Sequence, residues 1–478
     1  MSLLAGCSVF ICIAWLALSR AEVFLCFFLI LFTFAWRTVS SMYIDLYGPV
    51  YASQISLFIG PGVMTAFQST AYFLTVVPFL WVFSPAATDQ WVRSAHGRVA
   101  GRPILTLSDV TFYGSLIFLV LLFGALVEGG VLPILAKMER WTFNERAGWL
   151  HHFVLLRGDF ICFWWGTIFA AEKLRHDRFD YRFLGLLALL MIYIFLAGGR
   201  FSPFYRFGSF FIMPFSAVVL VHSKDAMSNG LSGLRSLIPD RRIVAAGFAM
   251  FVLASSLIAF ALYWNLTKVR GFEGKAAEAA FLERVMVQPS EMGWASYQRV
   301  FVNGQWDARK AVDFLFERPI AGGRNTTPQF LMSETIGEPR TTELTVAGFQ
   351  FAGGFPEIFF EVFGPYLGWL MLLGAGWLCA AVSALVVRSI VRGEYLVVAC
   401  AFQVLFGFYV MYIGGMLNFA TIASYWMKVG LLFIAMVAEY WMKRVNLSLL
   451  PWAIVDHDRI LWFRRKQSPR SPLGLLGH

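Results

Sequence analysis

Two arginines in the segment 196–208 are the first candidates for chemistry. Arg200 lies at a glycine-rich break between two apolar stretches, and Arg206 lies just inside the second stretch. An arginine at the centre of a membrane helix costs about 2.5–3.5 kcal/mol on insertion scales, so one that persists normally faces a cavity, a carboxylate or an anionic ligand. Because a guanidinium group presents paired donors to phosphate oxygens, the segment predicts a phosphate or pyrophosphate clamp. Anchoring at the membrane interface is the alternative, because a long side chain can reach water there.

Two acids, Glu357 and Glu361, follow the glycine pair at 353–354 and open another apolar stretch. Because they are four residues apart, they occupy one face of a helix. The helix dipole favours Glu357 in the first turn, whereas Glu361 lies deeper and needs a partner. Each acid is therefore a candidate for an ion pair with an arginine, or for a general base that removes the proton of a hydroxyl group.

Three further arginines are candidates for ligand binding. Arg318 and Arg324 flank a glycine-rich turn in which backbone amides can approach a ligand closely. A structural turn with solvated arginines is the alternative. Arg157, together with Asp159, heads the apolar stretch 153–172 and is expected either to line a cavity or to lie at the membrane interface.

Composition and motifs exclude several classes of function. The net charge of +10 does not indicate a nucleic-acid partner, because the basic residues lie in short connections rather than along one helix face. The adjacent histidines at 151 and 152 do not share a helix face, so they form a poor metal site. The chain contains no P-loop, nucleophile elbow or Asp-x-Asp motif. We therefore expect no metal and no cofactor.

The elements that must position these residues are membrane helices. Of the 478 residues, 58% are hydrophobic and 14% charged, whereas soluble domains are roughly 45–50% apolar and about 25% charged. Apolar stretches long enough to cross a hydrocarbon layer recur along the chain. The predicted fold class is all-α, a polytopic transmembrane helical protein. We expect about eleven spans, at residues 3–19, 21–37, 60–84, 105–127, 153–172, 182–198, 203–222, 243–264, 358–387, 395–416 and 420–442.

One large loop separates two groups of spans. The prediction divides the chain into eight spans within 1–264, a loop at 265–357, three spans within 358–443 and a basic tail at 444–478 that carries an interfacial helix. Lysine and arginine concentrate in alternate connections and in the tail, so the positive-inside rule places these segments in the cytoplasm and the large loop outside. Helical patterns at 275–288 and 306–317 predict that the loop is a small helical cap.

The order of these features resembles the Wzy-type O-antigen and exopolysaccharide polymerases of bacterial inner membranes. The similarity rests on the arginine-bearing break at 198–208, the large outer loop with the stretch 319–324, and the aromatic, acid-containing return at 353–368. Related ligases typically carry a histidine near the end of the loop. This chain has no histidine between His222 and His457, which favours the polymerase.

The resemblance implies a GT-C-like membrane protein of the bacterial inner membrane with its large loop in the periplasm. It implies a metal-independent glycosyl transfer, in which a growing glycan leaves undecaprenyl diphosphate for the sugar hydroxyl of an incoming lipid-linked repeat unit. The partners would be the undecaprenyl diphosphate-linked oligosaccharide, membrane lipids and a chain-length regulator protein. Arg200, Arg206 and Arg324 would stabilise the departing diphosphate, and Glu361 or Glu357 would serve as the base.

Two other functions fit a chain of this class. A transporter or flippase of an anionic or lipid-linked substrate would use the same arginines at broken helices, although the sequence has no internal repeat. A non-catalytic subunit of an envelope assembly would use the loop to bind another protein.

Overall fold

The computed structural model describes most of the chain. The described residues are 1–93, 107–128, 143–144, 146–176, 179–198, 201–228, 260, 263–269, 271–316, 327–346 and 353–445. Arg200, Arg318 and Arg324 lie outside them, as do most of the expected span 243–264 and the tail after residue 445.

Long apolar helices dominate the described residues, and this confirms an all-α, polytopic membrane protein. Among the described residues, eight helical stretches are long and apolar enough to cross a membrane. They comprise α1 (Ser2–Ser19), α2 (Ala21–Tyr47), α3 (Met64–Val82), α5 (Leu107–Glu128), α7 (Trp149–His176), α9 (Phe201–Ile212) continued by α10 (Phe215–Ser228), α18 (Glu357–Arg392) and α19 (Tyr395–Gly414). The shorter α8 (Arg182–Leu196) and α20 (Ala423–Val445) coincide with two further expected spans.

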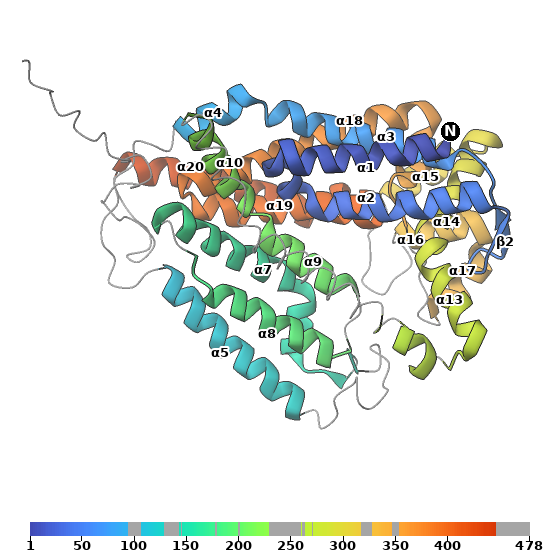
Figure 1. Ribbon diagram of the computed structural model, residues 1–478, viewed down its shortest axis with the longest axis horizontal. Coiled ribbons are helices and arrows are strands. Elements are labelled where there is room, and N and C mark those ends of the chain that lie inside the picture. Colours follow the sequence, from blue (N-terminus) through green and yellow to red (C-terminus); the bar gives the residue numbers. More distant parts are fainter. Residues whose placement is uncertain are drawn as a thin grey trace, which may run out of the picture.

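The long helices lie side by side, with a group of short helices at one end (Figure 1). We call this the cap end. Helices α1 and α2 form a hairpin in which only Arg20 separates them. The hairpin returns to the cap end, where the Ser2 hydroxyl donates to Asp45 over 2.8 Å. Asp45 in turn accepts the backbone N–H groups of Met64 and Thr65, so it caps the first turn of α3.

Helix α2 is longer than the sequence predicts. The expected span 21–37 ended at Arg37, because a charge normally marks the end of an apolar stretch. The helix instead continues to Tyr47, and Arg37 lies buried inside it. That placement is possible because Glu357 supplies a compensating charge from a distant part of the chain.

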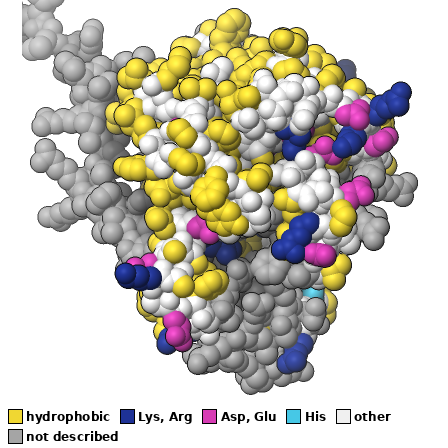
Figure 2. Space-filling model, turned by 90° about the vertical axis from the view of Figure 1, so that its right-hand side faces the viewer, with side chains coloured by type: hydrophobic (Ala, Val, Ile, Leu, Met, Phe, Trp, Pro, Cys, Tyr) yellow, Lys and Arg dark blue, Asp and Glu magenta, His cyan; other side chains and the backbone are white. Residues whose placement is uncertain are grey.

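Within the described residues of 265–357, five short α-helices lie at the cap end, and we call them the cap. They are α13 (Gly274–Met286), α14 (Gln288–Tyr297), α15 (Ala308–Phe316), α16 (Thr327–Ile336) and α17 (Glu338–Val346). Helices α13 and α15 confirm the two helical patterns. On this end of the molecule, acidic and basic side chains lie in mixed groups beside a wide apolar area (Figure 2). The strands β1 (Val50–Ala52) and β2 (Leu57–Ile59) form an antiparallel hairpin at the same end.

The cap is tied directly to the membrane helices. The Trp36 indole N–H donates to the Val285 carbonyl over 3.0 Å, and the Ser290 hydroxyl donates to the Arg37 carbonyl over 2.9 Å. At the start of α18, Gly354 has a φ of 139°, and an added Cβ would lie 2.4 Å from the Gly414 carbonyl oxygen. Only glycine permits that approach. The cap, the start of α18 and the end of α19 therefore meet at one junction.

Candidate functional site

A buried ion pair lies at this junction. Arg37 Nη2 donates to Glu357 Oε1 over 2.5 Å, and the side chains are 5% and 0% exposed. Glu357 Oε1 also accepts the backbone N–H of Gly354 over 2.6 Å. Burying two charges is costly unless each has a partner of opposite charge. Loss of either residue would therefore leave the other charge buried and uncompensated. Glu357 thus forms the ion pair with an arginine that was one of its two predicted roles.

Two neutral polar side chains complete what we call the junction cluster: Arg37, Gln68, Tyr72 and Glu357. Gln68 and Tyr72 are one turn apart on α3 and are 1% and 2% exposed. A Cβ added at Gly293 would lie 3.0 Å from Gln68 Nε2 and 3.4 Å from Arg37 Nη2, so these two side chains face the same backbone of α14. The Tyr72 phenol is close enough to interact electrostatically with both Arg37 and Glu357.

Glu361 is paired with a different arginine, one that sequence reasoning did not select. Arg299 donates to both carboxylate oxygens of Glu361. Its Nη1 donates to the Glu334 carbonyl over 2.8 Å, and the Trp306 indole donates to the Glu361 carbonyl over 2.9 Å. The Arg299 side chain is 13% exposed, so this pair lies nearer the surface of the cap than the Arg37 pair does. The two acids therefore meet two separate arginines.

Arg206 pairs with Asp159 across helices α9 and α7. Arg206 Nη2 contacts Asp159 Oδ2 at 2.8 Å, and Arg206 Nε donates to Asp159 Oδ1 over 3.1 Å. Asp159 is 4% exposed, whereas Arg206 is 32% exposed. A carboxylate was one of the partners that the sequence predicted for Arg206, and Asp159 is that partner. The rest of the Arg206 guanidinium group is partly exposed.

Arg157 lies on another face of α7, together with a lysine of α20. It is exposed, and it lies close enough to Lys428 for the two positive charges to repel each other. Within the described part of the chain, neither side chain forms an ion pair. Exposed apolar side chains lie beside both cations, among them Leu156 at 75% and Met427 at 68%. Two uncompensated cations thus share an apolar surface near the cap end.

The cap helix α14 contains a buried acid, Glu291. Glu291 of α14 is 0% exposed, and neither carboxylate oxygen has a hydrogen-bond partner among the described residues. Burial raises the pKa of Glu291 to about 9, with a smaller contribution from the negative charge of Glu283. Glu291 therefore carries a proton at neutral pH.

The raised pKa of Glu291 predicts how the stability of the protein depends on pH. The ordinary pKa of a glutamate is 4.5, and that of Glu291 in the folded protein is about 9. Between these two pH values, the folded protein therefore holds a proton that the unfolded chain has released. The stabilising contribution of the protonated form is therefore complete below pH 4.5 and is lost as the pH rises to 9. We expect the unfolding temperature to fall across this range in the wild type and to fall less in Glu291→Gln. Thermal unfolding at a series of pH values measures this, with the exposed Glu343→Gln as the control. Equal slopes for wild type and Glu291→Gln would contradict it.

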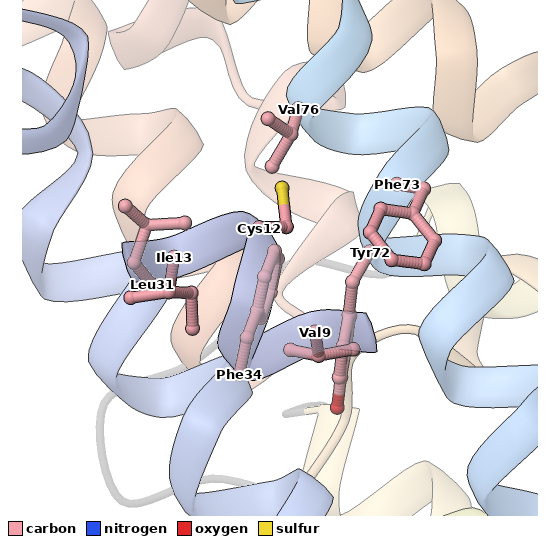
Figure 3. A pocket seen from close by; sticks show the side chains of 8 residues that line it. All are labelled: Val9, Cys12, Ile13, Leu31, Phe34, Tyr72, Phe73 and Val76. Carbon is pink, nitrogen blue, oxygen red and sulfur yellow. The ribbon is translucent and has the colours of Figure 1, made fainter. Parts of the chain in front are cut away.

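An apolar pocket between α1, α2 and α3 is not a second polar site. Its lining comprises Val9, Cys12, Ile13, Leu31, Phe34, Tyr72, Phe73 and Val76. Figure 3 shows that Tyr72 crosses this region with its hydroxyl at the end far from Val76. Within the described ranges, no three His, Cys, Asp or Glu side chains are grouped so that they could hold a metal ion.

Sequence reasoning missed the partners of the acids. Arg37 carries a signal that could have been used, since it is a charged residue inside a long apolar stretch. Lys428 carries the same signal in α20. Arg299 carries none, because an arginine in a mixed polar loop is ordinary. Gln68 is equally inconspicuous, because its burial depends on α14.

Comparisons with known proteins give one match. Residues 321–427 match a family of unknown function, DUF6418. The matched region begins before α16, includes Glu357 and Glu361, and ends in α20. No curated protein and no solved structure matches the chain.

Proposed function

We propose that this chain is a polysaccharide polymerase of the Wzy type. In this proposal it transfers a growing O-antigen or exopolysaccharide chain from undecaprenyl diphosphate to the sugar hydroxyl of an incoming lipid-linked repeat unit. The observation that carries the proposal is the pair Arg157 and Lys428, two cations without an ion-pair partner in the described residues, on an exposed apolar surface.

A lipid diphosphate matches that surface in both of its parts. Its phosphate oxygens would neutralise Arg157 and Lys428, and its isoprenoid chain would lie against neighbouring apolar side chains such as Leu156 and Met427. Charged groups in contact with a membrane normally have such a partner. Arg206 would contribute its outward face, while Asp159 holds its guanidinium in place.

The chemistry requires a base and stabilisation of the leaving group. We assign the base to Glu361, which pairs with Arg299 near the cap surface. In the transfer, the acceptor hydroxyl gives its proton to Glu361 and its oxygen bonds to the anomeric carbon of the growing chain. The bond from that carbon to the diphosphate breaks, and the lipid diphosphate leaves with the electron pair. Cations beside the diphosphate stabilise the negative charge that develops.

The charges at the ends of the helices support one orientation in the membrane. Basic residues lie at the end of the bundle opposite the cap, which the positive-inside rule assigns to the cytoplasm; they include Arg93, Lys173, Arg388, Arg392 and Arg444. We therefore propose a bacterial inner-membrane protein whose cap, residues 265–357, lies in the periplasm. A chain-length regulator protein would be its partner there.

One observation favours the alternative of a flippase. Gly364, with a φ of 79°, and Pro365 interrupt α18 close to the Trp306 ring. Broken helices line the substrate sites of many transporters. The two functions differ in where a lipid-linked intermediate accumulates.

A deletion strain separates them. Loss of a polymerase leaves the lipid-linked repeat unit on the periplasmic face, and surface glycans carry a single repeat. Loss of a flippase leaves that unit on the cytoplasmic face. Labelling the repeat unit with a sugar-oxidising reagent that does not cross the membrane distinguishes these outcomes. Accumulation on the cytoplasmic face alone would reject the polymerase.

A further inference from the structure

The junction cluster contains several polar atoms that have no hydrogen-bond partner in the described part of the chain. Among the described residues, Arg37 Nε and Nη1, both side-chain polar atoms of Gln68, the Tyr72 hydroxyl and Glu357 Oε2 have no hydrogen-bond partner. All four side chains are at most 5% exposed. Buried polar groups are normally paired, so a concentration of unpaired donors and acceptors in one place requires a reason.

The chemistry of these groups points to a neutral ligand. The charges of Arg37 and Glu357 cancel, so the cluster does not favour an anion as Arg157 and Lys428 do. The unused atoms include donors on Arg37 and acceptors on Glu357, and Gln68 provides one of each. A molecule with several hydroxyl groups, each both donor and acceptor, satisfies such a mixture. Trp294 lies on the same cap helix, and its indole N–H is also unpaired among the described residues.

Helix α14 covers the cluster in this structure. Its Gly293 backbone lies against Gln68 and Arg37, and an added Cβ at Gly293 would also lie 2.7 Å from the end of the Met64 side chain. On the other side of the cluster, Gly353 has a φ of 118°, and its added Cβ would lie 2.9 Å from Glu357 Oε1. Small residues thus bring the cap backbone directly onto the polar groups, and a displacement of α14 would uncover them.

We propose that the junction cluster is the site for the acceptor saccharide, closed by α14 in the resting protein. This inference rests on the proposed function, of which it names the acceptor side. Gln68, Tyr72 and the unused atoms of Arg37 and Glu357 bind sugar hydroxyls when α14 moves away. The cationic surface at Arg157 and Lys428 binds the diphosphate, so the two halves of the reaction use surfaces of different charge.

Isosteric apolar variants test the proposal, because they remove the unused groups without leaving a cavity. If the cluster is purely structural, Gln68→Leu and Tyr72→Phe each remove only an unpaired polar group. The binding of the saccharide would then not change. In a saccharide site, each variant weakens binding by about five- to tenfold, the effect of one lost hydrogen bond. The unfolding temperature of each variant stays at or above that of the wild type.

The probe is the repeat-unit oligosaccharide of the host, freed of its lipid and titrated against the purified protein in nanodiscs. The matched control is Tyr412→Phe, which removes another buried phenol whose hydroxyl has no described partner. Tyr412 packs instead against Phe355 and Phe27. We expect wild type and Tyr412→Phe to bind alike, and inorganic pyrophosphate not to compete with the oligosaccharide.

The outcomes separate this inference from the proposed function. Wild-type binding and normal polymer in Gln68→Leu and Tyr72→Phe would overturn the saccharide site and leave the polymerase standing. Binding that depends on Tyr72, in a protein that makes no polymer, would keep the saccharide site and remove the polymerase. An equal loss in Tyr412→Phe would also overturn the site, because the effect would then not be local.

Discussion

Replacing Arg37 with methionine is expected to reduce the stability of the protein by about 3–5 kcal/mol, because it leaves the Glu357 charge buried without a partner. The variant should accumulate poorly in the membrane. The purified fraction should unfold at a much lower temperature than the wild type. Thermal unfolding in detergent, followed by tryptophan fluorescence, measures the difference.

The double variant Arg37→Met with Glu357→Met isolates the cause. Replacement of a whole buried ion pair by apolar side chains of similar volume is often neutral or stabilising, so we expect most of the lost stability to return. Arg340→Met is the control, because Arg340 and Glu343 are 63% and 66% exposed and such pairs contribute at most about 1 kcal/mol. A single variant as stable as this control would contradict the structural role of the Arg37 pair.

Removing the two cations at the lipid-facing surface is expected to abolish most activity without unfolding the protein. Loss of one group that stabilises developing charge commonly lowers turnover by about 10²–10³-fold. We therefore expect Arg157→Gln and Lys428→Gln each to lower polymer formation to that degree. Stability should not change, because neither side chain has an ion-pair partner among the described residues and Arg157 is exposed.

The control for this prediction is Lys310→Gln. Lys310 is a 58% exposed cap residue that pairs with Glu334, so its loss removes a positive charge that already has an ion-pair partner. The length distribution of the polymer, measured at equal protein level, reports the effect. Normal polymer in the double variant Arg157→Gln with Lys428→Gln would exclude this surface from the diphosphate site.

The sequence predicts the helices well, because the length and apolar composition of a stretch are enough to indicate a membrane helix. The end of α2 is the instructive exception. The charge of Arg37 predicts the end of a span, because its partner, Glu357, is 320 positions away in the sequence. A local pattern contains no information about such a pair. The same reason explains why Arg206 was recognised as needing a partner, while its pairing with Asp159 required the packing of α7 against α9.

The candidate site was predicted in part. Glu357 and Glu361 stood out because acids inside an apolar stretch are costly and need compensation. Their arginine partners come from α2 and from the cap, two regions that only the tertiary structure brings together. Gln68 and Tyr72 were not recognisable, since polar residues on a membrane helix become a cluster only when α14 covers them.

In the proposed function, this chain alone transfers glycan from a lipid diphosphate to a lipid-linked acceptor. The most direct measurement uses the purified protein in nanodiscs with undecaprenyl diphosphate-linked repeat units, in the presence of a chelator and without nucleotide. We expect a ladder of products, with one undecaprenyl diphosphate released for each linkage formed. Intact substrate, under conditions in which a known polymerase of this type forms its ladder, would contradict the polymerase function.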